Sequence, residues 1–531
     1  MTLETLHTIK GILAGAVVAL AAAYWCLDRW RVAKGRPALD VLLILLAAVC
    51  AASYFDFGQF PKYRRFMNPH DVFHYYLGSK YSREIGFANL YECVAIATAE
   101  NHRGEILHPT IRKMDDYSFV SGKEVLAKAD TFKRPFSRDR WQEFKKDVRY
   151  FESLVTKRHW RGITLDMGYN PTPVWNMTGR FLTNRVPTES TAGMNFLVAI
   201  DLALLAATFS VVGRTFGWRA GLFTMMFFCT HFCMSYTHIR GGFLRMDWLA
   251  FLVMCVCAIK TGRYKTAAGL LGYAGMARVF PIIFGFGMGA KFLWSLWRTR
   301  RIERKYAEFF SVLAMVCAAL FAVSAWDDGG LHGWKEFAGK IGVHNAHIAP
   351  VRVGFKYVFL MAHTKPSGSW NVYKAAMTRQ FNERKAQWWL MIGAALAVSL
   401  LAVRKLEDYE SLAYGYVPAY FLTAPTFYYH IMMTPLLLLF LPKRDQPLRM
   451  AGVMGMFAVS ITMELLNVFM PLDVFLSFLM SCMLLVLCLY CAAAGLAARP
   501  VEAGATPIVA SETSPPSEKA RHAEKSLKKP Q

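Results

Sequence analysis

Apolar stretches separated by short polar or basic segments recur along most of the chain. They lie at about residues 9–27, 39–55, 194–212, 220–237, 247–261, 266–277, 279–297, 307–325, 387–403, 411–426, 430–442, 451–470 and 474–497. Several of them approach the roughly 18 to 20 apolar residues that a helix needs to cross about 30 Å of hydrocarbon. We therefore predict an all-α, polytopic membrane protein with about 13 transmembrane helices.

Two long polar segments, residues 56–193 and 326–386, interrupt these stretches. They divide the chain into two first membrane helices (1–55), a large loop region (56–193) and a transmembrane core (194–498) that contains the second loop. The last segment, 499–531, is rich in Pro, Ser, Glu, Lys and Ala and cannot bury a core, so we expect a disordered tail. The first apolar run has no cleavage site of small residues and ends in Trp25 and several arginines, so we expect it to be retained as a membrane helix.

Composition supports a membrane protein and charge gives its orientation. The 531 residues are 55% hydrophobic with a formal net charge of +24. The basic residues cluster in short segments that fall on one side of the membrane in this count: 29–36, 214–219, 260–265, 298–305, 404–405 and 443–449. By the positive-inside rule that side is cytoplasmic, which places the N-terminus and both long loops outside and the C-terminus inside the cytoplasmic membrane. Because no basic soluble domain is visible, we predict no nucleic-acid partner.

Most of the eleven cysteines lie inside apolar stretches, where cysteine behaves as a small hydrophobic residue. Cys229 and Cys233 would share a helix face, but no disulfide framework and no zinc-ligand spacing accompanies them.

The first outer segment contains a helical pattern in its polar middle part. Its apolar positions are Trp141, Phe144, Val148, Phe151 and Leu154. This spacing predicts either a small helical subdomain or an amphipathic helix on the membrane surface, with Lys145, Lys146 and Asp147 on the wet face.

The segment from Asn68 to Tyr81 follows the second apolar stretch and combines acid, imidazole and phenol groups. Asp71 is the candidate general base, and Asp166 is the reserve candidate. Asp71 could instead cap a helix that begins near Val72. His70 and His74 are four residues apart and, with Asp71, could bind a divalent metal. Because no further ligand is apparent, we predict no metal and no other cofactor.

Arginines in two glycine-containing segments could bind phosphate. Arg240 and Arg245 flank Gly241 and Gly242, which would let a ligand approach the backbone. The alternative is that these arginines extend to the lipid headgroups and that Arg245 contacts Asp247.

Arg278 ends a small-residue run, 269–277, between two apolar stretches. An ionisable residue in this position predicts a functional site facing a cavity, where it could hold a lipid-linked phosphate. The alternative is a turn residue that reaches the headgroups.

In their order along the chain, these motifs resemble the GT-C superfamily of integral-membrane glycosyltransferases, most closely the mannosyltransferase-like family eighty-seven. The motifs are Asp71 with Tyr75-Tyr76, Gly86 and Leu90-Tyr91; the Tyr169 to Pro173 turn; the segment from Gly242 to Asp247; and the run to Arg278 and Pro281. The resemblance covers about residues 40–445. An additional first span, an arginine at 278 where relatives often have lysine, and a larger insertion at about 100–160 depart from the family pattern.

The resemblance implies inverting transfer of a sugar from a polyprenyl-phosphate-linked donor to a lipid or glycan acceptor on the outer face, as in synthesis of cell-envelope glycans. It implies Asp71 as the base and Arg278, with Arg240 or Arg245, as the phosphate contact. The further candidates for substrate binding are His74, Tyr75, Tyr169, Asn170, His347 and His430.

Two other classes of function stay open from the sequence. A transporter or flippase for a lipid-linked or anionic substrate would also use Arg278 and the outer loops, although no internal repeat is visible. A non-enzymatic assembly factor would not need Asp71 or Arg278.

Overall fold

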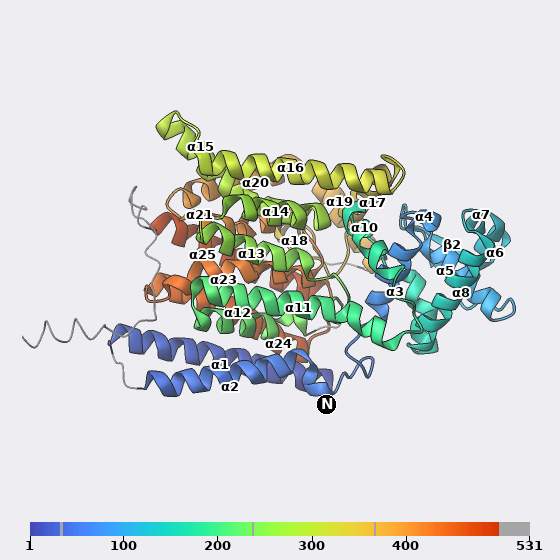
Figure 1. The fold of residues 1–531 in the computed structure, drawn as a ribbon, viewed down its shortest axis with the longest axis horizontal. Coiled ribbons are helices and arrows are strands. Elements are labelled where there is room, and N and C mark those ends of the chain that lie inside the picture. Colours follow the sequence, from blue (N-terminus) through green and yellow to red (C-terminus); the bar gives the residue numbers. More distant parts are fainter. Residues whose placement is uncertain (32–34, 236–237, 366–367, 499–531) are drawn as a thin grey trace, which may run out of the picture.

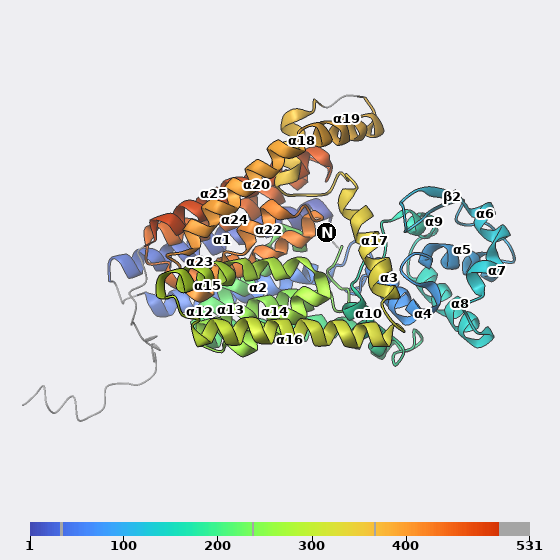
Figure 2. The same ribbon diagram turned by 90° about the horizontal axis from the view of Figure 1, so that it is seen from above.

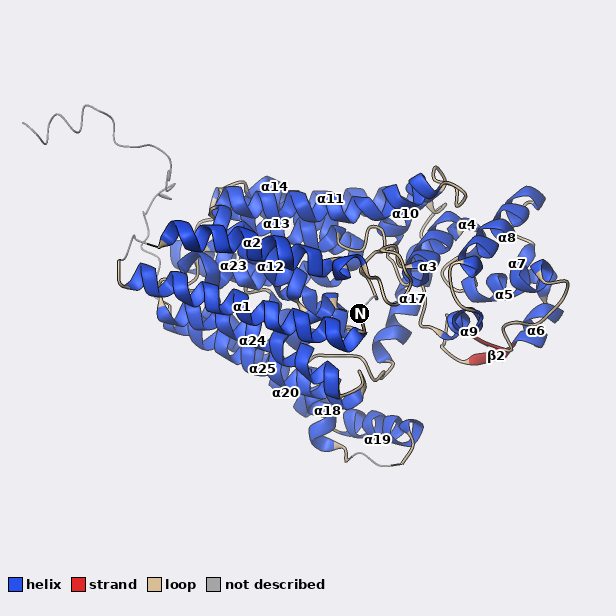
Figure 3. Cartoon of the chain, turned by 90° about the horizontal axis from the view of Figure 1, so that it is seen from below, coloured by secondary structure: helices blue, strands red, loops and turns tan. Residues whose placement is uncertain are grey.

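The computed structural model describes residues 1–31, 35–235, 238–365 and 368–498. Within these ranges the protein is all-α, as predicted, apart from one antiparallel hairpin of β1 (Thr110–Arg112) and β2 (Phe119–Ser121) (Figure 3). The predicted disorder of 499–531 falls outside the described residues.

In the described part of the chain, eight helices are long and apolar enough to cross a membrane. They are α1 (Leu3–Arg29), α2 (Arg36–Tyr54), α11 (Thr191–Phe216), α15 (Phe286–Thr299) with the preceding 3₁₀ turn η4 (Phe280–Gly285), α16 (Arg304–Asp327), α20 (Lys385–Val403), α24 (Pro447–Phe469) and α25 (Val474–Ala497). Each coincides with a predicted span, and together they give the chain the character of a multi-pass membrane protein.

The other five predicted spans form shorter helices, so helix length does not establish thirteen crossings. They are α12 (Trp218–Thr230), α13 (Asp247–Lys260), α14 (Tyr264–Arg278), the pair α21 (Asp408–Ala413) and α22 (Tyr416–Leu422), and α23 (Thr434–Phe440) between the 3₁₀ turns η5 (Phe427–Met433) and η6 (Leu441–Lys443). Even the fifteen residues of α14 extend only about 22 Å. All seven residues of α23 are buried, so its apolar composition reflects packing inside the protein.

Basic segments gather at one end of the bundle, opposite the outer region (Figure 1). Arg219 Nε lies 2.7 Å from Asp40 Oδ1, which joins the start of α12 to the start of α2. Lys260 and Lys443 both pair with Glu407, at 3.0 and 2.7 Å. Segments far apart in sequence therefore meet there as a layer of ion pairs.

The first outer segment forms a helical subdomain at the opposite end. It comprises η1 (Asp56–Gly58), α3 (Pro69–Lys80), α4 (Ser82–Ile85), α5 (Leu90–Asn101), α6 (Gly122–Ala127), α7 (Ala129–Lys133), α8 (Arg138–Ser153), α9 (Lys157–Gly162), the 3₁₀ turn η2 (Ile163–Leu165) and α10 (Pro173–Thr183). The predicted apolar positions Trp141, Phe144, Val148 and Phe151 of α8 are buried in a core shared with α3 and α5. This apolar face packs inside a subdomain and does not lie on lipid.

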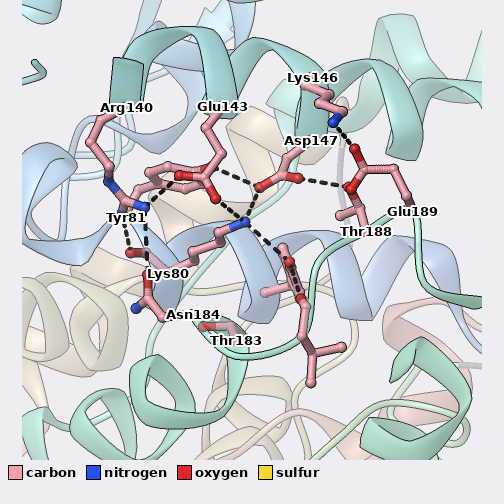
Figure 4. Close-up of polar contacts among 12 residues, drawn as sticks. Lys80, Tyr81, Arg140, Glu143, Lys146, Asp147, Thr183, Asn184, Thr188 and Glu189 are labelled. Atoms are coloured by element: carbon pink, nitrogen blue, oxygen red, sulfur yellow. Dashed lines mark hydrogen bonds and ion pairs between the residues drawn. The ribbon is translucent and has the colours of Figure 1, made fainter. Parts of the chain in front are cut away.

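The prediction that Asp147 lies on the wet face of α8 is wrong (Figure 4). Asp147 is buried and accepts hydrogen bonds from Lys80, Tyr81 and Thr188, each at 2.7 Å. The ammonium of Lys80 also lies 2.9 Å from Glu143. These contacts satisfy the buried carboxylate of Asp147, and those from Lys80 and Tyr81 join α8 to the end of α3.

The second outer segment lies at the end of the bundle that faces the subdomain (Figure 2). It contains α17 (His332–Ala346), α18 (Phe355–His363) and α19 (Trp370–Glu383), and α17 crosses the end of the bundle (Figure 2). The buried Lys340 of α17 donates hydrogen bonds to the carbonyls of Phe87 and Tyr169, both at 2.5 Å. One lysine thus ties α17 to two loops of the first outer segment. The 3₁₀ turn η3 (Phe232–Met234) follows α12.

Candidate functional site

A cavity of about 600 Å³ lies where the outer segments meet the bundle. Its polar wall includes Asp71, Asp166, Asn170, Arg245 and Arg278. Its apolar wall includes Phe280, Ile282, Phe337, Trp388 and Phe421, several of which belong to the membrane bundle. The cavity therefore offers charged groups and a hydrocarbon-like surface to the same ligand.

Asp71 lies in the first turn of α3 and faces this cavity. Asn68 caps the helix, because its side-chain oxygen accepts the N–H of Asp71 at 3.2 Å. The alternative role of Asp71 as the cap, and the predicted start near Val72, are therefore wrong, since the helix begins at Pro69. Asp71 Oδ1 lies 3.2 Å from Arg245 Nε, and Oδ2 has no hydrogen-bond partner among the described residues.

The protonation of Asp71 depends on two opposing effects. Burial raises the pKa of its carboxyl, and the charge of Arg245 opposes that rise. Burial prevails, so the carboxylate is more basic than an exposed aspartate.

The glycines before Arg245 pack closely against the start of α3, and access of a ligand to their backbone stays a prediction. Gly241 has a φ of +76°, and a Cβ there would overlap the carbonyl oxygen of Phe66. A Cβ at Gly242 would overlap the carboxylate of Asp71. The two glycines thus allow the backbone before Arg245 to pass close to the start of α3.

Arg245 and Arg278 lie over the same aromatic ring. Their guanidinium carbons are 4.0 and 5.3 Å from the ring centroid of Tyr75, and that of Arg278 is 5.2 Å from Trp175. Arg278 Nη2 donates to the Leu244 carbonyl at 3.3 Å. Nη1 of Arg245, and both Nε and Nη1 of Arg278, are buried without a hydrogen-bond partner in the described part of the chain. Buried donors of this kind are available to an anionic ligand.

Arg245 does not contact Asp247, contrary to the alternative prediction. It pairs with Asp71, whereas Asp247 Oδ2 accepts a hydrogen bond from Tyr273 at 3.0 Å.

Strained backbone flanks both arginines. Leu244 and Val279 have φ angles of +50° and +60°. Such angles are unusual for large or β-branched side chains, cost about 1–3 kcal/mol each, and cluster at functional sites.

Arg240 does not line the cavity. Its guanidinium binds both carboxylate oxygens of Asp56, at 2.7 and 2.5 Å, and donates to the Tyr54 carbonyl at 2.9 Å. Lys10 lies 3.8 Å from the same carboxylate. This buried pairing joins the bundle to the loop after α2 and occupies the guanidinium of Arg240 outside the cavity lining.

Of the predicted residues Tyr169 and Asn170, only Asn170 lines the cavity. Tyr169 is buried and donates to Asn176, and its ring would lie 2.6 Å from a Cβ at Gly78. The amide of Asn170 donates to the Met167 carbonyl at 3.0 Å.

The predicted candidates His347 and His430 also lie outside the lining. His430 is buried, with Nδ1 3.0 Å from the Tyr416 hydroxyl and Nε2 3.1 Å from the Val353 carbonyl. Lys374 Nζ lies 3.2 Å from His347 Nδ1.

Sequence reasoning missed Arg352 and Lys356, which do line the cavity. Arg352 precedes α18 and Lys356 lies in its first turn, and neither belongs to a recognisable motif.

His70 and His74 of α3 lie close to the carboxylate of Asp166, which belongs to the loop after η2. Asp166 Oδ2 lies 3.4 Å from His70 Nε2 and 3.7 Å from His74 Nε2. The predicted grouping of these histidines with Asp71 is therefore wrong. Positions 70 and 74 share a helix face, whereas position 71 lies about 100° around the helix from position 70 and its carboxylate pairs with Arg245.

His74 and Asp166 both have pKa values below their ordinary ones, although burial acts in opposite directions on the two residues. Burial lowers the pKa of His74 to about 3, and the charge of His70 acts in the same direction. Partial desolvation in the cavity wall would raise the pKa of the half-exposed Asp166 carboxyl, but its hydrogen bond with His70 and the nearby imidazoles hold that pKa below its ordinary value.

The fold and the cavity define a multi-pass, all-α membrane protein with a charged cavity at the junction of bundle and outer region. Comparison with protein-family models, with curated proteins and with solved structures gave no match.

Proposed function

We propose that this protein is a membrane glycosyltransferase that moves a sugar from a polyprenyl-phosphate-linked donor to a lipid or glycan acceptor. The observation that carries the proposal is the grouping of one basic carboxylate, two arginines with unpartnered N–H groups and an apolar wall in a single cavity. A lipid-linked sugar phosphate presents matching parts, because it joins a hydroxyl-rich ring and an anion to a hydrocarbon chain.

Asp71 is the proposed general base. The acceptor hydroxyl attacks the anomeric carbon, the bond from that carbon to the phosphate oxygen breaks, and the hydroxyl proton passes to Asp71. The free Oδ2 atom of Asp71 is available for that proton, while Oδ1 stays beside Arg245. A positioned base of this kind contributes about a hundred- to ten-thousandfold.

Arg245 and Arg278 are the proposed phosphate contacts. As the bond to the sugar breaks, negative charge develops on the departing polyprenyl phosphate. Guanidinium groups already buried beside Tyr75 stabilise that charge without reorganising solvent.

The proposed site of action is the outer face of the cytoplasmic membrane. The grouping of basic segments at the end of the bundle away from the cavity supports a cytoplasmic location for that end. The N-terminus and both outer segments then face outside, with the membrane itself and the donor lipid as partners.

Asp71→Asn tests the proposal in a reconstituted transfer assay. We expect kcat to fall to about 1% of wild type or less, because the amide cannot accept the proton. The substitution also leaves the buried Arg245 without its anion, so folding must be monitored. Asp56→Asn is the matched control, because it breaks the buried pair with Arg240 away from the cavity, and it should keep transfer in the folded fraction.

Near-full transfer by folded Asp71→Asn would reject Asp71 as the base. If Asp166→Asn then abolished transfer without loss of fold, the reserve candidate would be the base. If wild type instead moved the lipid-linked sugar across vesicles without transferring it, the protein would be a flippase.

A further inference from the structure

His70, His74 and Asp166 form a group of three potential metal ligands, two imidazoles and one carboxylate, from two separate segments. Their ligand atoms all lie within 4.8 Å of one another, and the two measured nitrogen-to-oxygen distances are 3.4 and 3.7 Å. A tetrahedral zinc ion with bonds of about 2.1 Å separates its ligands by about 3.4 Å. The two histidine-to-aspartate separations match this value to within about 0.3 Å, whereas the widest separation in the group, up to 4.8 Å, has to close further before all three residues surround an ion.

The surroundings orient the imidazoles as ligands. The Nδ1–H of His74 donates to the His70 carbonyl at 2.7 Å, which leaves the lone pair on Nε2, the atom nearest Asp166. His70 uses Nδ1 toward His159 Nε2 at 3.1 Å, so its own Nε2 also faces Asp166. Metal-binding histidines are held in this way by a hydrogen bond at the other ring nitrogen.

We propose that His70, His74 and Asp166 bind one divalent transition-metal ion of the zinc type at the edge of the cavity. All three residues line the cavity, so an ion bound by them would lie in its wall. The side chain of Asp166 is 48% exposed, which gives an ion a path of entry, whereas that of His74 is 4% exposed and fixed on α3. Three protein ligands and one open position are typical of a zinc ion that also meets a substrate or water.

The opposing interpretation is a hydrogen-bonded cluster without metal. The hydroxyl of Tyr91 donates to His74 Nε2 at 2.7 Å and occupies the lone pair that an ion would use. The metal interpretation makes a specific prediction for Tyr91→Phe. If the group binds metal, removing that hydroxyl keeps or strengthens metal binding, because a competitor for Nε2 is lost.

The test measures metal, not sugar transfer, so its result is independent of the proposed function. The full-length protein, purified in detergent with zinc and dialysed, should hold about one zinc per chain by elemental analysis. Chelator-treated protein should bind Co²⁺ with the visible absorption of a four-coordinate site. Added Zn²⁺ should also raise its melting temperature, because the ion binds only the folded chain.

The variants assign the ligands. His74→Ala and Asp166→Asn should each weaken zinc binding by more than about a hundredfold, and His159→Ala, which only positions His70, by about ten- to a hundredfold. His102→Ala is the matched control, because His102 pairs with Glu152 at 2.9 Å elsewhere in the outer subdomain, and it should leave zinc binding unchanged.

Three results would overturn the proposal: wild-type protein without zinc, equal zinc content in wild type and Asp166→Asn, or loss of zinc from His102→Ala as well. Asp166→Asn keeps the size of the side chain, and the folded fraction of Asp71→Asn should retain zinc even if it loses transfer. Failure of metal binding and failure of sugar transfer can thus be told apart.

Discussion

Arg278 is held mainly by aromatic rings and one backbone carbonyl, and most of its N–H groups have no partner in the described chain. If it binds the departing phosphate, Arg278→Ala should slow transfer about a hundredfold or more. Arg278→Lys should retain part of the rate, because it keeps the charge and loses the planar fork. The measurement is kcat/KM in the reconstituted assay.

Arg185→Ala, which removes an exposed arginine that is not part of the cavity lining, should transfer at the wild-type rate. Equal activity of Arg278→Ala and Arg185→Ala would remove Arg278 from the proposed mechanism.

At the level of elements, α17 is joined to the first outer segment by the buried Lys340. Burial lowers the pKa of Lys340 from 10.5 to about 7, so between these values the unfolded chain binds more protons than the folded one. The free energy of unfolding should therefore rise with pH from about 7 to 10.5, by up to about 5 kcal/mol from this residue.

Lys340→Met removes the titrating group and is the comparison that isolates it. The melting temperature of wild type minus that of Lys340→Met should increase as pH rises from 7 to 10. A difference that stays constant or decreases over this range would show that Lys340 is charged in the folded protein.

For the whole molecule, the proposed orientation can be tested with an impermeant thiol reagent on intact cells. Asp130→Cys in α7 should react and Arg301→Cys in the loop before α16 should not, relative to the background of the wild-type cysteines. Both positions are exposed in the structure, so access depends on the side of the membrane. Reaction at position 301 and not at position 130 would show that the orientation in the membrane is opposite to the proposed one, and it would reject a transferase acting on the outer face.

The local pattern of the sequence was sufficient to predict the all-α class, the eight long helices and the apolar face of α8. A run of about twenty apolar residues favours a membrane-spanning helix, and apolar residues at helical spacing favour a helix with one buried face, and both signals are local in the sequence. The sequence pattern could not separate lipid-facing helices from short buried ones such as α23, because both kinds of helix are apolar. The sequence also marked Asp71, Arg245 and Arg278, which line one cavity.

Only the tertiary structure decided which charged groups meet. It pairs Arg240 with Asp56, Asp147 with Lys80, and the histidines of α3 with Asp166. These partners are 184, 67 and up to 96 positions apart, and a charge offers no periodic signal that selects one distant partner over another. The choice depends on how the elements pack, because a buried charge is stable only beside the group that packing brings to it.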